Sequence, residues 1–325
     1  MINFFPQYLI NAIKYLIPKR KGKGYFPKII LGFLFLLRKI VLLFSDPLIQ
    51  SKIGKYILQF PLSHYLPIDY TEDPTQFQNL ANIASIANSY FKNFSLIDIG
   101  ANIGDSFAVV RTESFFPILC IEGDRKYFSL LESNVGMIEE AVTVHALVGE
   151  NDTTADVKLT DNYGGSKNLS FSPNAQTQVS TLTTLLEQHS FFWDSKMLKI
   201  DVDGYDCKIL RGAKKYLQDT KPIIFFEYSP RYFTLHNDDG FSIFRFLEDL
   251  GYFSLLIYEG HGDLLCSTNF AEMRLLEELH YYFSGSGTNR HADICVFHRE
   301  DSELYHKTRD FELQYYARKR RFSLL

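Results

Sequence analysis

The sequence predicts an α/β fold in which helices cover both faces of a doubly wound, mostly parallel sheet. From about residue 95 onward, short apolar runs alternate with segments of helix length. The runs are apolar almost throughout, which is typical of strands that are buried on both faces. A chain of 325 residues with 46% hydrophobic residues is also long enough to enclose such a sheet.

The elements of this sheet are expected in a regular order. The apolar runs predict five strands, at residues 95–99, 117–122, 141–147, 197–202 and 222–228. The segments between them predict helices at 104–114, 125–134, 181–189 and 205–217. Residues 152–173 are rich in Asn, Gly, Ser and Thr, so we expect them to leave the sheet.

The pattern changes after residue 229. Residues 241–250 predict a helix that Gly251 ends. Two strand-like runs, 252–258 and 264–267, flank a glycine-rich stretch and predict a hairpin. A last helix at 271–283 and a last strand at 293–298 follow.

Composition excludes several classes of protein. The net charge of −4 provides no overall positive field, so we expect no nucleic-acid partner. The four cysteines are far apart, which disfavours a structural zinc site and a disulfide-stapled secreted domain. Without an evident secretory signal, the chain is expected in the cytoplasm.

The N-terminal residues 1–60 predict a basic, aromatic-rich helical extension. Every charge between Lys14 and Lys39 is positive. The longest apolar stretch has nine residues and ends at Arg38, which is short for a membrane-spanning helix. One interpretation is an amphipathic helix on the inner face of an anionic membrane. The other is a helix packed on the protein with its basic face in water. Residues 301–325 form a basic C-terminal tail.

The segment LIDIGANIGDSF predicts a ligand-binding turn. An apolar strand contains Asp98, and the chain then turns through Gly100 and Gly104 into a helix. Glycines let a ligand approach the backbone, and the first turn of a helix offers unpaired N–H groups. The spacing is not the GxGxxG of dinucleotide-binding enzymes, and an acid near the turn suits a cationic ligand.

A second acid is predicted at the neighbouring strand end. Glu122 closes the run PILCIE, 24 residues after Asp98. A carboxylate in this place can accept hydrogen bonds from both hydroxyls of a ribose. The two acids therefore predict a pocket for a nucleoside that carries an amino acid or another cation. The alternative is an unrelated α/β sheet in which Asp105 caps a helix and Glu122 is exposed.

Further acids follow two later strands. Asp201, Asp203 and Asp206 come at the end of MLKIDVDGYD, and Glu227 closes PIIFFEYSP. Ligands of open α/β sheets bind beyond such strand ends, so we expect Asp201 and Glu227 to face the bound nucleoside and its co-substrate. For Asp206, helix capping is the favoured interpretation.

Together these motifs resemble the FkbM family of S-adenosylmethionine-dependent methyltransferases. The matching segments are IDIGANIGDS, ILCIEGDRKYFSLLESN, LKIDVDGYDCKILRGA and PIIFFEYSP. The resemblance implies a methyltransferase domain over residues 61–300 with the Rossmann-like class I fold. This fold has a seven-stranded, mostly parallel sheet and one antiparallel strand at its edge, for which residues 293–298 are the candidate.

The resemblance also implies S-adenosyl-L-methionine as the cofactor. Four residues of the turn would surround its methionine end: Asp98, Gly100, Asn102 and Gly104. Glu122 would hold the ribose hydroxyls, and Ala146 and Leu147 would lie beside the adenine. The family implies O-methylation of a sugar, a glycan or a related secondary metabolite, with a small molecule or glycan as acceptor.

Several roles stay open at this point. Asp201 or Glu227 is expected to remove the proton of the accepting hydroxyl, with His64 and His261 as further candidates. Asp201, Asp203 and Glu227 would suit Mg²⁺, but no tight ligand cluster is present and we predict no metal. The alternative functions are a nucleotide- or NAD-dependent oxidoreductase on a similar sheet and a non-catalytic, membrane-associated accessory protein.

Overall fold

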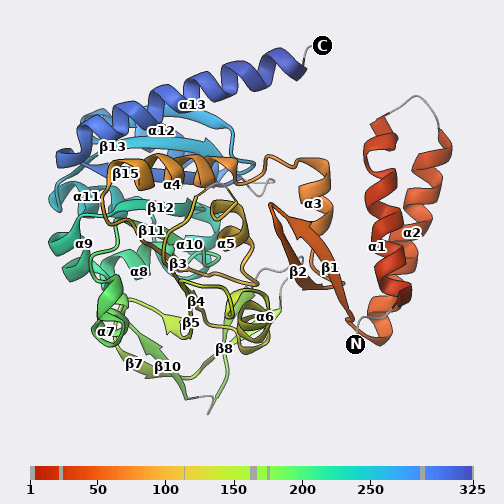
Figure 1. The fold of residues 1–325 in the computed structure, drawn as a ribbon. Helices are drawn as coiled ribbons and strands as arrows, with labels where there is room; N and C mark the ends of the chain where they lie inside the picture. The colour runs from red at the N-terminus through yellow and green to blue at the C-terminus, as the bar shows by residue number, and fades with distance from the viewer. Residues whose placement is uncertain are drawn as a thin grey trace.

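An eight-stranded sheet organises the molecule (Figure 1). The computed structural model describes residues 4–21, 25–112, 114–161, 167–173, 176–285 and 290–323. The strand order is β14-β13-β15-β12-β11-β3-β4-β5. The strands are β3 (Leu96–Ile99), β4 (Ile118–Glu122), β5 (Ala141–His145), β11 (Met197–Ile200), β12 (Ile223–Tyr228), β13 (Tyr252–Glu259), β14 (Leu264–Asn269) and β15 (Ala292–His298). Neighbouring strands from β5 to β12 are parallel, which confirms the predicted fold class.

The antiparallel part of the sheet differs from the expectation. β15 is antiparallel as predicted, but it lies between β12 and β13 and not at the edge. The edge is formed by β14, which returns from β13 as the second arm of the predicted hairpin. Because this arm extends the sheet by pairing with β13, the sheet has eight strands where seven were expected.

Helices cover both faces of the sheet and explain why its strands are apolar throughout. One face packs against α4 (Gln78–Tyr90), α5 (Asp105–Val110), α6 (Arg125–Val135) and α13 (Ser302–Ser323). The other packs against α7 (Leu182–Gln188), α8 (Asp206–Gly212), α9 (Lys214–Thr220), α10 (Pro230–Leu235), α11 (Ser242–Asp249) and α12 (Met273–Ser284). Short 3-10 helices complete the chain: η3 (Ser190–Phe192), η4 (Phe270–Glu272) and η5 (Arg299–Asp301).

Several predicted elements differ from those in the structure. The helix expected at 205–217 is divided into α8 and α9, which Ala213 separates. The strand expected at 141–147 ends at His145, because the next residues pair with another sheet. The C-terminal tail is a helix whose buried residues reach Glu312, so much of it packs on the protein.

The excursion predicted at 152–173 lies outside the large sheet, as expected. It contributes to a small sheet with the order β6-β10-β7 and to a two-stranded ribbon of β8 and β9. These strands are β6 (Leu147–Val148), β7 (Thr153–Ala155), β8 (Val157–Asp161), β9 (Lys167–Phe171) and β10 (Thr177–Ser180).

The N-terminal residues form a helical hairpin beside a β-ribbon. The elements are α1 (Phe4–Leu16), η1 (Pro18–Lys21), α2 (Tyr25–Phe44), β1 (Leu48–Ile53), β2 (Tyr56–Pro61) and α3 (Leu66–Glu72). The ribbon contacts α5 and α6 on one side and α1 on the other, so it separates the hairpin from the sheet (Figure 1). Residues 48–61 are thus strands, within the extension that was expected to be helical. Across the described ranges, no helix combines the length and hydropathy that a membrane span requires.

Candidate active site

The glycine turn after β3 brings two strand ends into contact. Gly100 and Gly104 have φ angles of +79° and +92°, in the region that favours glycine. A Cβ atom on Gly100 would lie 1.9 Å from the backbone oxygen of Asp201, at the end of β11. A Cβ atom on Gly104 would lie 2.8 Å from the side chain of Val135 in α6. The turn therefore requires glycine at both positions, for close approach and for backbone conformation.

Asp98 lies beneath this turn in a buried ion pair. Its side chain is fully buried, and its Oδ1 atom lies 3.0 Å from Nζ of Lys199 on the adjacent strand β11. The hydroxyl of Ser106 donates a hydrogen bond to its other oxygen. Burial by itself lowers the pKa of Lys199, but the nearby carboxylates raise it above its ordinary value. Lys199 is therefore charged and links β3 to β11.

Glu122 is held by the backbone on both of its oxygens. The N–H of Asn102 donates to Oε2 at 2.8 Å, and the N–H of Asp124 donates to Oε1 at 2.7 Å. Burial raises the pKa of Glu122 to about 7, although the two N–H donors oppose the shift. Because each carboxylate oxygen has two lone pairs, the fixed side chain can still accept further hydrogen bonds.

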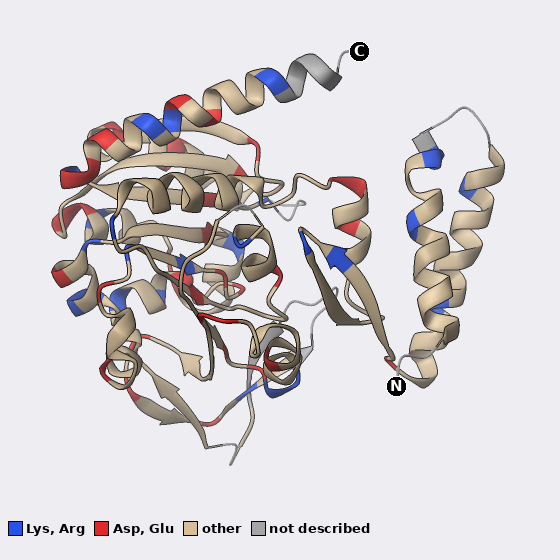
Figure 2. Ribbon diagram, viewed as in Figure 1, with Lys and Arg blue, Asp and Glu red and all other residues tan. Residues whose placement is uncertain are grey.

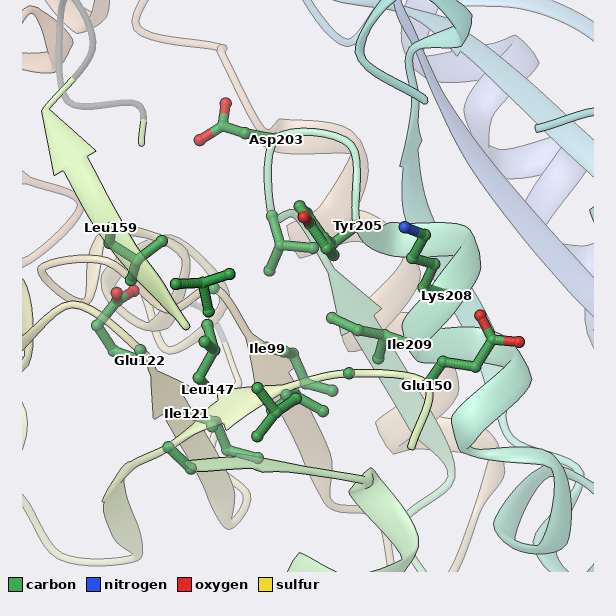
Figure 3. Close-up of a pocket in the computed structure, with 18 of the residues that line it drawn as sticks. Ile99, Ile121, Glu122, Leu147, Glu150, Leu159, Asp203, Tyr205, Lys208 and Ile209 are labelled. Atoms are coloured by element: carbon green, nitrogen blue, oxygen red, sulfur yellow. The ribbon is translucent and has the colours of Figure 1, made fainter. Parts of the chain in front are cut away.

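An apolar cavity of about 400 Å³ lies beyond these strand ends (Figure 3). Its apolar lining includes Ile99, Ile121, Leu147, Leu159, Val179 and Ile209. Figure 3 shows Glu122 on one side of the cavity, with Glu150 and Lys208 on the other. An apolar cavity of this size with few polar groups is typical of a small-molecule site.

A larger, acidic cleft adjoins the apolar cavity. Its volume is about 1100 Å³. The acidic side chains that line it are Asp69, Glu72, Asp73, Asp201, Asp203, Glu227, Glu259, Asp263 and Asp293. The arginines that line it are Arg20, Arg231 and Arg290. Asp201 and Asp203 line both spaces, so the cleft and the cavity meet at these two residues.

The carboxyl groups of the cleft affect one another. Glu227 on β12 lies opposite Asp293 on the antiparallel strand β15. Burial raises the pKa of Glu227 well above its ordinary value, and the carboxylates of Asp201, Asp206 and Asp203 raise it further. Burial also raises the pKa of Asp293 to about 6. A carboxyl with a raised pKa is a stronger base once it has lost its proton.

The structure brings most of the predicted site residues together. Six of them line the apolar cavity: Gly100, Asn102, Glu122, Ala146, Leu147 and Asp201. Glu227 lines the cleft, whereas Asp98 and Gly104 line neither space. The roles of all nine residues in catalysis and cofactor binding stay predictions.

The two histidines lie in different surroundings. His64 is buried, its Nδ1 accepts a hydrogen bond from the N–H of Leu66, and burial lowers its pKa to about 4. It is therefore neutral near pH 7. His261 lines the acidic cleft. Within the part of the chain that the structure describes, no group of three or more His, Cys, Asp or Glu side chains has the arrangement to hold a metal ion.

Sequence reasoning missed Lys199 and part of the cavity wall. A lysine inside the otherwise apolar strand MLKI is a signal of a buried ion pair, because an unpaired buried lysine is costly. Leu159 and Val179 come from the strands outside the large sheet, and their position depends on how that excursion folds back.

Comparison with known proteins identifies the domain. Residues 98–254 match the family model of the Methyltransferase FkbM domain. A search of curated proteins found no significant match. Among solved structures, methyltransferase FkbM from Methylobacillus flagellatus KT is 17% identical with a TM-score of 0.31, and the match covers 46% of this chain and 37% of that one. This chain thus matches well under half the length of that protein.

In two other methyltransferase structures, the match covers a larger share of the known protein. Precorrin-6y C5,15-methyltransferase from Geobacter metallireducens GS-15 is 12% identical, with 68% of this chain and 87% of that chain covered and a TM-score of 0.35. The O-methyltransferase from Bacillus cereus in complex with SAH is 11% identical. The match covers 68% of this chain and 80% of that chain, with a TM-score of 0.36. The family match confirms the resemblance that the motifs carry: residues 98–254 of this protein match the FkbM methyltransferase domain.

Proposed function

We propose that this protein transfers the methyl group of S-adenosylmethionine to a hydroxyl of a sugar, a glycan or a related secondary metabolite. The proposal rests on one observation: the apolar cavity and the acidic cleft meet at Asp201 and Asp203. A methyltransferase needs a donor site and an acceptor site that open onto each other, since the methyl group passes directly between them.

The apolar cavity suits the donor. Its volume of about 400 Å³ falls in the range of small-molecule sites. Glu122 can accept hydrogen bonds from both ribose hydroxyls, because the backbone holds its carboxylate in place. The adenine would lie against the apolar side chains, including Leu147. Asp201 adds negative charge at the end of the cavity where a cationic sulfur is expected.

The acidic cleft suits an acceptor with several hydroxyl groups. Carboxylates accept hydrogen bonds from hydroxyls, and nine acidic residues of the described part of the chain line this cleft. The same charges repel phosphate-rich acceptors, which supports the expectation that nucleic acid is not a substrate.

The catalytic groups are proposed from the junction of the two spaces. S-adenosylmethionine supplies a methyl group on a positively charged sulfur. The carboxylate of Asp201 or Glu227 takes the proton of the accepting hydroxyl as the new C–O bond forms and the C–S bond breaks. The products are a methyl ether, S-adenosylhomocysteine and a protonated carboxyl. Glu227 has the raised pKa that favours this role, and Asp201 lies nearer to the donor cavity.

Binding is tested without knowledge of the acceptor. Calorimetry should show heat from S-adenosylhomocysteine and none from NADH at the same concentration. Binding of NADH alone would contradict the proposal and favour the oxidoreductase alternative. Binding of S-adenosylhomocysteine without methyl transfer to any member of a panel of mono- and oligosaccharides would favour the accessory-protein alternative.

The base is tested by two substitutions. We expect Asp201→Asn or Glu227→Gln to lower kcat with an active saccharide by about 100-fold or more, because general base catalysis contributes this much. Each variant should keep its affinity for S-adenosylhomocysteine within about threefold, since that ligand needs no base. Glu278→Gln, at an exposed position of α12 that lines neither space, is the matched control. If both variants keep normal turnover, the base lies elsewhere.

A further inference from the structure

The outer face of α2 is an exposed apolar surface, and we infer that it docks on an anionic lipid bilayer. We define the α2 stripe as Ile29, Phe33, Leu36, Ile40 and Leu43. These residues recur every three or four positions, so they share one face of the helix. All five are exposed, from 44% for Ile40 to 80% for Leu43. A monomeric protein rarely exposes so continuous an apolar surface without a partner.

Arg38 does not interrupt this stripe, although it lies within the apolar segment of the sequence. It is buried, with its Nε donating to the carbonyl oxygen of Leu62 and its Nη2 to that of Ser63, both at 2.9 Å. Its guanidinium also stacks 4.3 Å from the ring centre of Tyr65. Arg38 therefore anchors the inner face of α2 to the protein, and the stripe on the opposite face contains no charged side chain.

Lysines flank the stripe on one side. Lys28 and Lys39 are eleven residues apart, which is close to three helical turns, so they lie on the same flank. Both are exposed, and neither forms an ion pair within the described ranges. Lys19 is a further exposed cation near the turn of the hairpin, above the ring of Tyr15. This arrangement of apolar side chains beside lysines is typical of helices that lie in a membrane interface.

The charge of the hairpin distinguishes a bilayer from a second copy of the chain. Residues 1–44 contain eight Lys and Arg and no Asp or Glu (Figure 2). Since the whole chain has 34 Lys and Arg against 38 Asp and Glu, the remaining residues carry a net charge of −12. Two hairpins that packed stripe against stripe would bring like charges together. An anionic lipid surface attracts the same lysines.

The other helix of the hairpin adds aromatic side chains. α1 exposes Phe4, Phe5, Tyr8 and Tyr15. Its opposite face buries Leu9, Ile10 and Ile13 against the protein, so the exposed side chains are not part of the hydrophobic core. Because neither helix is suited to span a membrane, the hairpin would lie flat on the bilayer.

Vesicle flotation of the full chain tests this inference. We expect binding to vesicles of phosphatidylcholine and phosphatidylglycerol at a ratio of about 3:1, less binding at high salt, and little to phosphatidylcholine alone. The variant Ile29→Ser/Phe33→Ser/Leu36→Ser should lose about 100-fold or more in affinity, because three apolar side chains no longer insert. Lys28→Gln/Lys39→Gln should lose about 25-fold, or about fivefold for each lysine.

The matched control removes equally exposed apolar side chains from elsewhere on the surface. Met137→Ser/Phe191→Ser/Leu235→Ser replaces residues that are 96%, 69% and 64% exposed, and it should bind vesicles as the unaltered protein does. Thermal unfolding confirms that every variant is folded, and the inference does not depend on the methyltransferase activity.

Two results would overturn the inference. One is the absence of binding to the anionic vesicles by the unaltered protein. The other is a dimer, seen by light scattering, that the triple serine variant of α2 converts to a monomer, since the stripe would then cover a second copy.

Discussion

The apolar cavity and the acidic cleft meet at Asp201, but they are built from different parts of the chain. Among the residues that the structure describes, all those that line the cavity lie between Ile99 and Ile209, inside the segment that matches the FkbM domain. Most residues that line the cleft lie outside that segment, at positions 69–77, 259–263 and 290–293, together with Arg20 from the hairpin. The proposed donor site is thus a property of the family domain, whereas the proposed acceptor site depends on what surrounds it.

The two spaces also differ in how their polar groups are held. In the cavity, two backbone N–H groups fix the carboxylate of Glu122. Beneath the glycine turn, Asp98 forms an ion pair with Lys199. In the cleft, Glu227 and Asp293 lie opposite each other on paired strands, and burial and neighbouring carboxylates raise the pKa of both. We therefore expect substitutions around the cavity to cost much stability or affinity. Neutral substitutions in the cleft should cost little or even stabilise the protein.

The largest effect is expected from Asp98→Asn. The substitution leaves Lys199 buried without its closest carboxylate, so the free energy of unfolding should fall by about 3–5 kcal/mol. Urea denaturation measures this change. The exposed pair of Lys221 and Glu300 provides the control, because Glu300→Gln should leave the free energy of unfolding nearly unchanged. Unchanged stability with loss of S-adenosylhomocysteine binding would instead indicate that Asp98 contacts the ligand directly.

Gly100→Ala should have the next largest effect. The new Cβ would lie 1.9 Å from the backbone oxygen of Asp201 at a φ of +79°, so we expect a loss of about 3 kcal/mol in stability and loss of ligand binding. Gly32→Ala in α2 is the matched control, because nothing lies within 4 Å of the new atom. It should be neutral or stabilise the protein by about 0.5–1 kcal/mol. Equal effects of both substitutions would contradict the close contact between the turn and β11.

Glu122→Gln should act on affinity more than on stability. We expect the affinity for S-adenosylhomocysteine to fall by about 100-fold, because two hydrogen bonds to a charged acceptor are weakened. In the unaltered protein, affinity should rise about tenfold from pH 6 to pH 8, as the carboxyl with a pKa of about 7 loses its proton. Calorimetry across this range should show the rise, and the variant should show none. A pH-dependent rise that persists in the variant would assign it to another group.

Asp293→Asn in the cleft should have the smallest effect, with the opposite sign. Burial raises the pKa of Asp293 to about 6 in the folded protein, above the 3.8 of the free group. Because the folded protein holds this proton more tightly than the unfolded chain, the stability of the folded protein is highest below about pH 4, where the carboxyl is protonated in both states. This stability is lost as the pH rises through 6. The variant should be more stable than the unaltered protein at pH 8, and the difference should shrink as the pH falls towards 4. Urea denaturation at the two pH values checks this, and a variant that is less stable at pH 8 would contradict it.

The sequence alone determined the features that depend on neighbouring residues. The apolar runs predicted the parallel strands, because a strand buried on both faces must be apolar at every position. The glycine turn and Glu122 were predictable for a similar reason, since a strand, a turn and a helix N-terminus follow one another directly in the chain. The hairpin of β13 and β14 was also predicted, but not that its second arm adds an eighth strand.

Only the tertiary structure decided which distant side chains meet. Asp98 and Lys199 are about a hundred residues apart in sequence, and their pairing follows from the adjacency of β3 and β11. In the sequence, Arg38 interrupts an apolar segment, yet the packing of α2 turns it inward and leaves the stripe intact. The acidic cleft likewise unites segments that no local pattern connects. Local patterns specify an element and its buried face, whereas the partner of a side chain depends on how whole elements pack.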